Sequence, residues 1–229
     1  MASIITIDGP SGAGKSTVAR ELARMLGYDY IDSGALYRIV ALEAHQEHID
    51  ENDDENLAGI CRTLDVSFLI EEGTYSIMYR GRDISDALRS PDISMIASRI
   101  SARKVVRDHL TGLQREMGKE EKVVLEGRDA GTVVFPEAPV KFFLDATPEE
   151  RGRRRFKELQ EKGEQVNLEQ VSSDIKRRDA NDSSRRHAPL VPAHDAVIID
   201  SSPMTVGEVV TRMIEVILSK KTKGVQVNG

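Results

Sequence analysis

The stretch IITIDGPSGAGKSTVARELARML, residues 4–26, decides the fold because it joins a strand pattern, a glycine-rich loop and a helix pattern. Three isoleucines among its first four residues make a β-branched run that is typical of a buried strand. Glycines then interrupt the run, and Val18, Leu22, Met25 and Leu26 recur at helical spacing. The segment therefore predicts a strand, a tight loop and a helix, in that order.

The loop matches the pattern G-x-x-x-x-G-K-[ST] in the setting that this pattern requires, between a strand and a helix. Backbone N–H groups of such a loop close around phosphate oxygens, and the start of the helix adds a favourable partial charge. We expect Lys15 to reach the outer phosphates and Ser16 to ligate Mg²⁺. The alternative is a turn that only connects two elements, which the lysine and the hydroxyl argue against. A magnesium-bound nucleoside triphosphate is expected at Gly9, Pro10, Ser11, Gly12, Ala13, Gly14, Lys15, Ser16 and Thr17.

Three later segments, at residues 122–127, 140–146 and 196–202, have the continuous apolar character of strands that are covered on both faces. Helical stretches separate them, which predicts an α/β fold with a parallel, doubly wound sheet. Residues 64–85 differ, because apolar residues alternate on both sides of a turn at Glu72 and Gly73 and so predict a β-hairpin.

The hairpin suggests a small accessory domain within a larger one. We expect a core of residues 1–34 and 96–220, an inserted domain of residues 35–95 and a flexible tail at residues 221–229. The 229 residues, 39% of them apolar, suffice for such a core.

Composition excludes several classes of function. No window approaches the roughly 18 uninterrupted apolar residues that a membrane span needs. The net charge of -6 argues against general binding to nucleic acid polymers. The amino terminus lacks a secretion-signal pattern and the single Cys61 cannot form an intramolecular disulfide, so we expect a cytoplasmic protein. A monomer is also expected.

Arginines are concentrated in the last third of the chain. A capping threonine, a proline and a glutamate at residues 147–150 predict a helix start, after which Arg151, Arg154 and Arg155 share one face. A solvated surface is one interpretation of that face. Beside a phosphate loop, we favour a mobile lid at about residues 148–167 that closes over the triphosphate.

A second helical stripe changes character along its length. It begins with the apolar Leu168 and continues, ten, fourteen and seventeen residues later, with Arg178, Asp182 and Arg185. Buried charges need partners, so this face is expected to hold a polar, anionic ligand if the helix persists. Fraying near Asn181 would instead leave the three side chains solvated. Solvation is expected in either case for the outer residues Arg177, Asp179 and Arg186.

Two further clusters follow predicted strands or begin helices. Arg128 and Asp129 come directly after the second strand, at the end of the sheet where the phosphate loop also lies. A turn with a local ion pair is the alternative for these two residues. Asp32 or Ser33 can cap a helix that carries Arg38 one turn later, and the functional and structural interpretations of that cluster stay open.

Together, the segments GPSGAGKS (9–16), DSGALYR (32–38), EGRDAGTVVFPEAPVKFFLDA (126–146) and RRDANDSSRRHAPLVP (177–192) resemble the bacterial-type cytidylate kinase family. The resemblance runs along nearly the whole chain. It implies a P-loop nucleoside monophosphate kinase fold, and transfer of the γ-phosphoryl group of ATP to CMP or dCMP with Mg²⁺.

By position, the resemblance assigns Lys15, Arg128 and Arg185 to catalysis. The family's acceptor site maps onto Ser33, Arg38, Ser98, Arg107, Arg128, Asp129, Arg178, Asp182 and Arg185. Within this set, the resemblance places Ser98, Arg107 and Asp129 at the cytosine. Glu126 stands where the family more often has aspartate, so its role in holding magnesium-bound water stays open.

Two other functions compete with this interpretation. The chain lacks the N-K-x-D sequence of GTPases, but another P-loop kinase of small metabolites is compatible with the loop. A nucleotide-binding module without turnover is the third possibility, against which the intact Lys15 and Ser16 argue.

Overall fold

The structure, a computed structural model, describes residues 4–71, 74–119 and 122–225. The chain divides into two compact units, which we call the core unit (residues 1–30 and 120–229) and the inserted unit (residues 31–119). These limits differ from the expected insertion at residues 35–95. The difference is largest at the carboxyl-terminal boundary, residue 119 instead of 95, because the two helices that precede residue 119 pack within the inserted unit.

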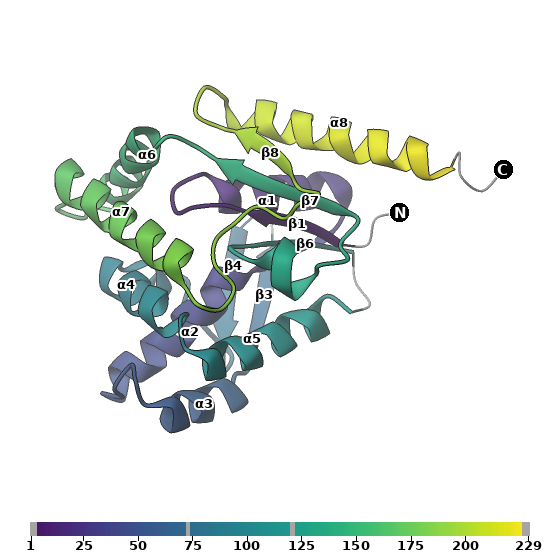
Figure 1. The fold of residues 1–229 in the computed structure, drawn as a ribbon. Coiled ribbons are helices and arrows are strands. Elements are labelled where there is room, and N and C mark those ends of the chain that lie inside the picture. Colours follow the sequence, from purple (N-terminus) through teal and green to yellow (C-terminus); the bar gives the residue numbers. More distant parts are fainter. Residues whose placement is uncertain (1–3, 72–73, 120–121, 226–229) are drawn as a thin grey trace. The chain divides into compact units, whose positions relative to one another are not determined.

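A five-stranded sheet lies at the centre of the described part of the core unit, with the strand order β2-β6-β1-β7-β8 (Figure 1). The central strand β1 pairs in parallel with β6 and β7, and β7 pairs in parallel with β8. The order reverses around β1, so the phosphate loop leaves the sheet at the switch point where α/β proteins bind ligands. The strands are β1 (Ile4–Asp8), β2 (Asp29–Asp32), β6 (Val123–Gly127), β7 (Val140–Asp145) and β8 (Val197–Asp200).

The four strands expected from the sequence are confirmed, but β2 was not predicted. It is only four residues long and carries an aspartate at each end, so it lacks the apolar run that marks the other strands. The expectation that both faces of each strand are covered is wrong for β8. This strand lies at the sheet edge, and its Ile198 is 64% exposed.

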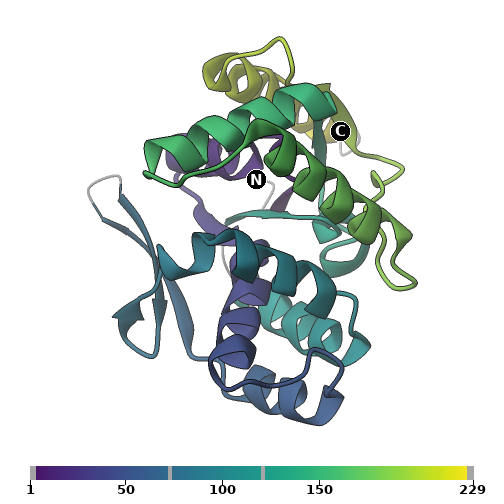
Figure 2. The same ribbon diagram turned by 90° about the vertical axis from the view of Figure 1, so that its left-hand side faces the viewer.

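Four α-helices and one π-helical turn accompany this sheet within the described residues. Helices α1 and α8 contact each other, while α6 and α7 pack side by side (Figure 2). Helix α8 continues to Val225, beyond the position at which a flexible tail was expected, and residues 226–229 lie outside the described residues. The elements are α1 (Lys15–Leu26), η2 (Ala130–Val134), α6 (Pro148–Glu161), α7 (Leu168–Ser184) and α8 (Val206–Val225).

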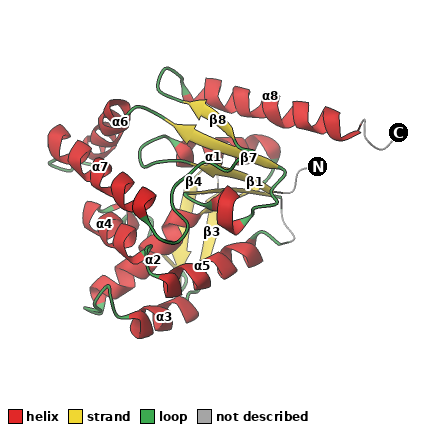
Figure 3. Ribbon diagram, in the orientation of Figure 1, coloured by secondary structure: helices red, strands yellow, loops and turns green. Residues whose placement is uncertain are grey.

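The inserted unit combines helices with the predicted hairpin (Figure 3). Strands β3 and β4 pair in antiparallel register from Val66 opposite Tyr79 onward, which confirms the hairpin. Its expected turn at residues 72–73 lies outside the described residues. The elements are α2 (Ser33–Gln46), α3 (Asp54–Arg62), β3 (Val66–Glu71), β4 (Thr74–Tyr79), β5 (Arg82–Asp83), η1 (Ala87–Arg89), α4 (Pro91–Ile100) and α5 (Lys104–Met117).

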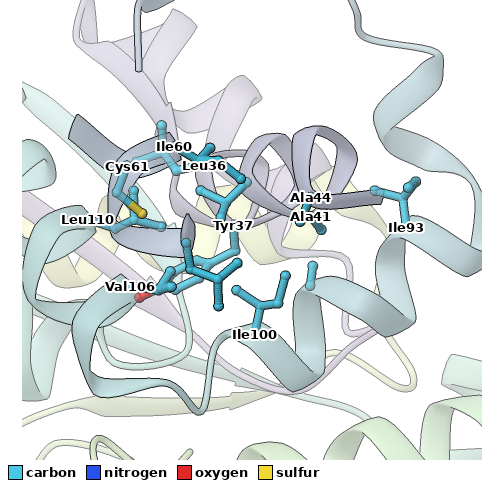
Figure 4. Packing of buried hydrophobic residues seen from close by; sticks show 13 residues of the cluster. Leu36, Tyr37, Ala41, Ala44, Ile60, Cys61, Ile93, Ile100, Val106 and Leu110 are labelled. Atoms are coloured by element: carbon cyan, nitrogen blue, oxygen red, sulfur yellow. The ribbon is translucent and has the colours of Figure 1, made fainter. Parts of the chain in front are cut away.

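The helices of the inserted unit share one apolar core, in which Leu36, Ile60, Ile100 and Leu110 converge from α2, α3, α4 and α5 (Figure 4). This common core explains why α4 and α5 belong to the inserted unit. Cys61 lies in the same core, where burial raises the pKa of its thiol to about 11, as expected for a structural cysteine.

None of the described helices combines the length and the apolar character that a membrane span requires.

Candidate active site

The phosphate loop depends on glycine at three positions. Gly12 and Gly14 have positive φ angles of 79° and 91°, which side chains rarely adopt. A Cβ atom at Gly9 would lie 2.0 Å from the carbonyl oxygen of Leu144, so only glycine allows this close approach to β7. The loop thereby leads directly into α1, whose N-cap is Gly14.

Lys15 begins α1, and its side chain folds back along the loop. Only 6% of the residue is exposed, and its ammonium group donates to the carbonyl oxygen of Pro10 at 2.7 Å. Burial, and secondarily the nearby positive charge of Arg128, lowers the pKa of Lys15 to about 7, although Glu126 opposes this shift. An anionic ligand would favour the charged form. Ser16 and Thr17, also predicted for the triphosphate, are exposed at the first turn.

Asp8, the last residue of β1, was not among the predicted site residues. Its carboxylate accepts hydrogen bonds from the backbone N–H groups of Ala130 and Gly131, at 2.8 and 2.7 Å. A Cβ atom at Gly131 would lie 2.8 Å from the hydroxyl oxygen of Thr6, so glycine permits this contact. Asp8 therefore holds the turn that follows Arg128 and Asp129. The sequence did contain a signal for Asp8, namely an acidic residue at the end of an otherwise apolar strand.

Asp8 should make folding stability depend on pH. Burial, only partly opposed by its two backbone hydrogen bonds, raises the pKa of Asp8 from 3.8 to about 6. A raised carboxyl pKa means that the folded protein binds the proton more tightly than the unfolded chain, so this contribution to stability is lost as pH rises from about 4 to 6. The difference in unfolding free energy between the parent protein and Asp8→Asn should therefore fall by about 2 kcal/mol between pH 4 and 6, out of about 3 kcal/mol in total.

Urea denaturation of both proteins at several pH values measures this difference. Asp86→Asn, at an exposed position of the inserted unit, is the control and should show no comparable change. A difference that rises with pH would mean that Asp8 is stabilised as a carboxylate, contrary to its burial.

Glu126 lies beside the loop at the end of β6 and is buried. It accepts a hydrogen bond from the hydroxyl of Tyr30, which is buried on the neighbouring strand β2. The sequence could not supply this partner, because the two residues are 96 positions apart. The contact gives the Glu126 side chain, which is longer than an aspartate would be, a structural partner within the core unit.

The helical stripe of α7 persists through Ser184, so the alternative of fraying near Asn181 is wrong. Asp182 is almost fully buried and accepts hydrogen bonds from Arg128, at 2.8 Å, and from Arg185. Burial alone would raise the pKa of Asp182, but the charges of Arg128, Arg185 and Arg178 outweigh it and hold the pKa below its usual value. The structure thus brings together Arg128, which follows β6, with Asp182 and Arg185 at the end of α7.

The helix start at residues 147–150 is confirmed, since Thr147 caps α6 and Pro148 occupies its first turn. Arg151 is buried and donates to the carbonyl oxygen of Ser11 and to the carboxylate of Asp179. The expected solvation of Asp179 is therefore wrong, because α6 supplies a partner.

The other two lid candidates have different partners. Arg154 bonds to Ser201 and to the carbonyl oxygen of Ala13, whereas Arg155 pairs with Glu158 on its own helix. Contact of the lid arginines with phosphate stays a prediction.

The remaining predicted residues lie in the inserted unit. Asp32 caps α2 by accepting from the N–H of Ala35, and it pairs with Arg38 at 2.7 Å, whereas Ser33 is buried at the start of the helix.

Two predicted base-reading residues come from neighbouring helices of that unit. Ser98 on α4 has a buried hydroxyl with no hydrogen-bond partner among the described residues. Arg107 on α5 is buried, donates to the carbonyl oxygen of Ser101 at 3.1 Å, and lies over the Tyr37 ring. Asp129 is buried in the core unit, whereas Ser98 and Arg107 belong to the inserted unit. The joint role of these three residues stays a prediction.

Comparisons with known proteins give one family for this chain. The family model described as cytidylate kinase matches residues 5–219. The cytidylate kinase of Syntrophotalea carbinolica is 50% identical over 218 residues, covering 95% of this chain and 93% of that protein. The cytidylate kinase of Geobacter sulfurreducens is 51% identical over 218 residues, covering 95% and 94%.

Among solved structures, a gluconokinase from Sinorhizobium meliloti aligns with a TM-score of 0.53 at 16% identity, covering 98% of this chain and 97% of its own. This likeness supports the α/β kinase fold alone. The family match and the two sequence relatives extend over the phosphate loop and both arginine-rich segments, and the chain therefore belongs to the cytidylate kinase family.

Proposed function

We propose that the protein transfers the γ-phosphoryl group of ATP to CMP or dCMP, giving ADP and CDP or dCDP. The observation that carries this proposal is the set of partly buried arginines, Arg128 and Arg185, that pair with the buried Asp182 in the same unit as the phosphate loop. A kinase with an anionic acceptor needs positive charge for two phosphorylated substrates, and arginine suits phosphate recognition. Membership of the cytidylate kinase family supports the choice of acceptor.

The donor is ATP with Mg²⁺, held by the loop residues 9–17. Among the described residues, no group of three or more His, Cys, Asp or Glu side chains could hold a metal ion. A single hydroxyl ligand from the loop fits Mg²⁺ that is bound together with the nucleotide, because Mg²⁺ usually binds through phosphates, waters and one or two protein oxygens. The exposed hydroxyl of Ser16 is the proposed protein ligand. When bound, the ion neutralises part of the charge on the transferred group.

Phosphoryl transfer here needs no protein base. The acceptor phosphate has a second pKa near 6, so an anionic oxygen is available at neutral pH. Lys15, Arg128 and Arg185 stabilise the charge that develops during in-line transfer, while the remaining residues orient the substrates. Arg38 also binds the acceptor phosphate beside Ser33, and Arg178 and Asp182 bind the sugar.

Base recognition is assigned to Ser98, Arg107 and Asp129. Asp129 accepts from the exocyclic amino group of cytosine, and Arg107 donates to the ring acceptors. Uracil presents an oxygen in place of the amino group, which leaves Asp129 without a donor. The buried hydroxyl of Ser98 supports a ligand group at that position, because such hydroxyls ordinarily find a partner.

Replacing Asp129 by alanine should erode the preference for CMP over UMP. We expect the ratio of their kcat/KM values to fall by about 10- to 100-fold, since one charged hydrogen bond to the base edge is lost. Steady-state kinetics with both acceptors measure this ratio, and Asp108→Ala, in an exposed ion pair with Lys104, is the matched control. If the ratio stays at the parent value, base recognition lies elsewhere.

A panel of acceptors tests the proposed function as a whole. With ATP and Mg²⁺, the protein should phosphorylate CMP and dCMP well, and UMP and AMP poorly. Equal or better use of AMP would contradict the proposal, and no transfer to any nucleotide would favour another small-molecule kinase or a binding module.

A further inference from the structure

Side chains outside the phosphate loop hold its carbonyl oxygens. Arg151 donates to Ser11 at 3.0 Å, and Ser201 donates to Ala13 at 3.1 Å, with Arg154 also within reach of Ala13 at 3.4 Å. In a trans peptide, the carbonyl and the following N–H point in opposite directions. These donors therefore orient the N–H groups that follow Ser11 and Ala13 away from the donor side chains.

Arg151 connects the loop to two other parts of the core unit. It is 5% exposed, and besides Ser11 it donates to the carbonyl oxygen of Ala146 and, at 2.5 Å, to the carboxylate of Asp179. A Cβ atom at Gly12 would lie 3.0 Å from two atoms of Arg151, so the loop also packs against the helix backbone. One guanidinium group thus joins the loop, the end of β7 and helix α7.

Asp179 connects this junction to the residues proposed for the acceptor nucleotide. It follows Arg178 directly and precedes Asp182 by one helical turn. Helices α6 and α7 also share a small apolar core with Leu159, Val171 and Ile175. The two helices are therefore packed together, and Arg151 links Ser11 of the loop to Asp179 of α7.

We propose that the Arg151–Asp179 ion pair couples the two substrate sites, so that ATP and CMP each bind more tightly when the other is present. This inference rests on the proposed function, because it takes the loop as the ATP site and α7 as part of the CMP site. Arg151 and Asp179 are then positioning residues. Coupling between two sites is reciprocal and typically changes affinity by about 5- to 150-fold.

The test measures the dissociation constant of an unreactive ATP analogue, whose β–γ bridging oxygen is replaced, with and without saturating CMP. In the parent protein, CMP should lower this constant by about tenfold. Asp179→Asn keeps the side-chain shape but removes the charge, and should reduce the effect of CMP to less than about threefold. Arg151→Lys should do the same, because the compact ammonium group of lysine lacks the planar fork with which the guanidinium group spans its three acceptors.

The matched control is Asp174→Asn, which removes the carboxylate of an exposed ion pair with Arg177 on the same helix. It should retain the full effect of CMP. Melting temperatures identify a variant that fails to fold; if Asp179→Asn fails, Arg151→Lys carries the test. The double variant should lose no more coupling than either single variant, because both remove the same link.

The outcomes separate this inference from the function on which it rests. If the parent protein does not phosphorylate CMP, the proposed function fails. If it does so but shows no coupling, or if Asp179→Asn retains all of it, the inference fails. Arg151→Lys that weakens binding of the analogue while leaving the effect of CMP intact would indicate a direct phosphate contact instead.

Discussion

Replacing Lys15 by alanine is expected to lower kcat by about 100- to 1,000-fold, because a preorganised cationic donor is lost from the transition state. Lys15 is almost fully buried beside Asp8 and Glu126, which oppose the effect of burial on its pKa. Water cannot readily take over the role of the ammonium group at such a buried position. A positive charge there also stabilises the transition state more strongly than it would in bulk solvent.

Steady-state kinetics with saturating CMP and magnesium-bound ATP measure this loss. Lys104→Ala, which removes an exposed lysine paired with Asp108, is the control and should leave kcat unchanged. Melting temperatures distinguish lost chemistry from lost folding. If Lys15→Ala turned over near the parent rate, Lys15 would not be a catalytic residue.

Replacing Asp182 by alanine is expected to destabilise the protein by about 3–5 kcal/mol, which is the usual effect of removing one partner from a buried charge cluster. The Asp182 side chain is 4% exposed and contacts Arg128 and Arg185, while Arg178 adds a third nearby charge. Alanine leaves these guanidinium groups without their shared carboxylate. The same change should raise KM for CMP, since the arginines lose their fixed orientation.

Urea denaturation at neutral pH measures the change in unfolding free energy. Asp174→Ala removes a carboxylate from the same helix, but from an exposed pair, and should change stability by less than about 1 kcal/mol. Asp182→Asn keeps the shape and tests whether charge is the cause. An Asp182→Ala variant as stable as the parent protein would mean that the arginines find solvent or other partners.

Short-range patterns predicted much of this protein. The phosphate loop, the core strands β1, β6, β7 and β8, and the β3–β4 hairpin depend on residues close together in the chain. The caps at Asn167 and Thr147 bond to N–H groups no more than three positions away. The charged stripe on α7 was visible because helical periodicity places every third or fourth residue on one face.

Partners distant in the chain were decided by the tertiary structure. Asp8 bonds to residues 122 and 123 positions away, and Arg151 reaches Ser11 across 140 positions. The limits of the inserted unit likewise depend on α4 and α5 packing against α2 and α3. Periodicity indicates which face of an element is buried, but not which other element covers it. The sequence therefore predicted the charged face of α7, whereas the packing of the sheet and helices determined that Asp8 is buried and that Asp179 has a partner on α6.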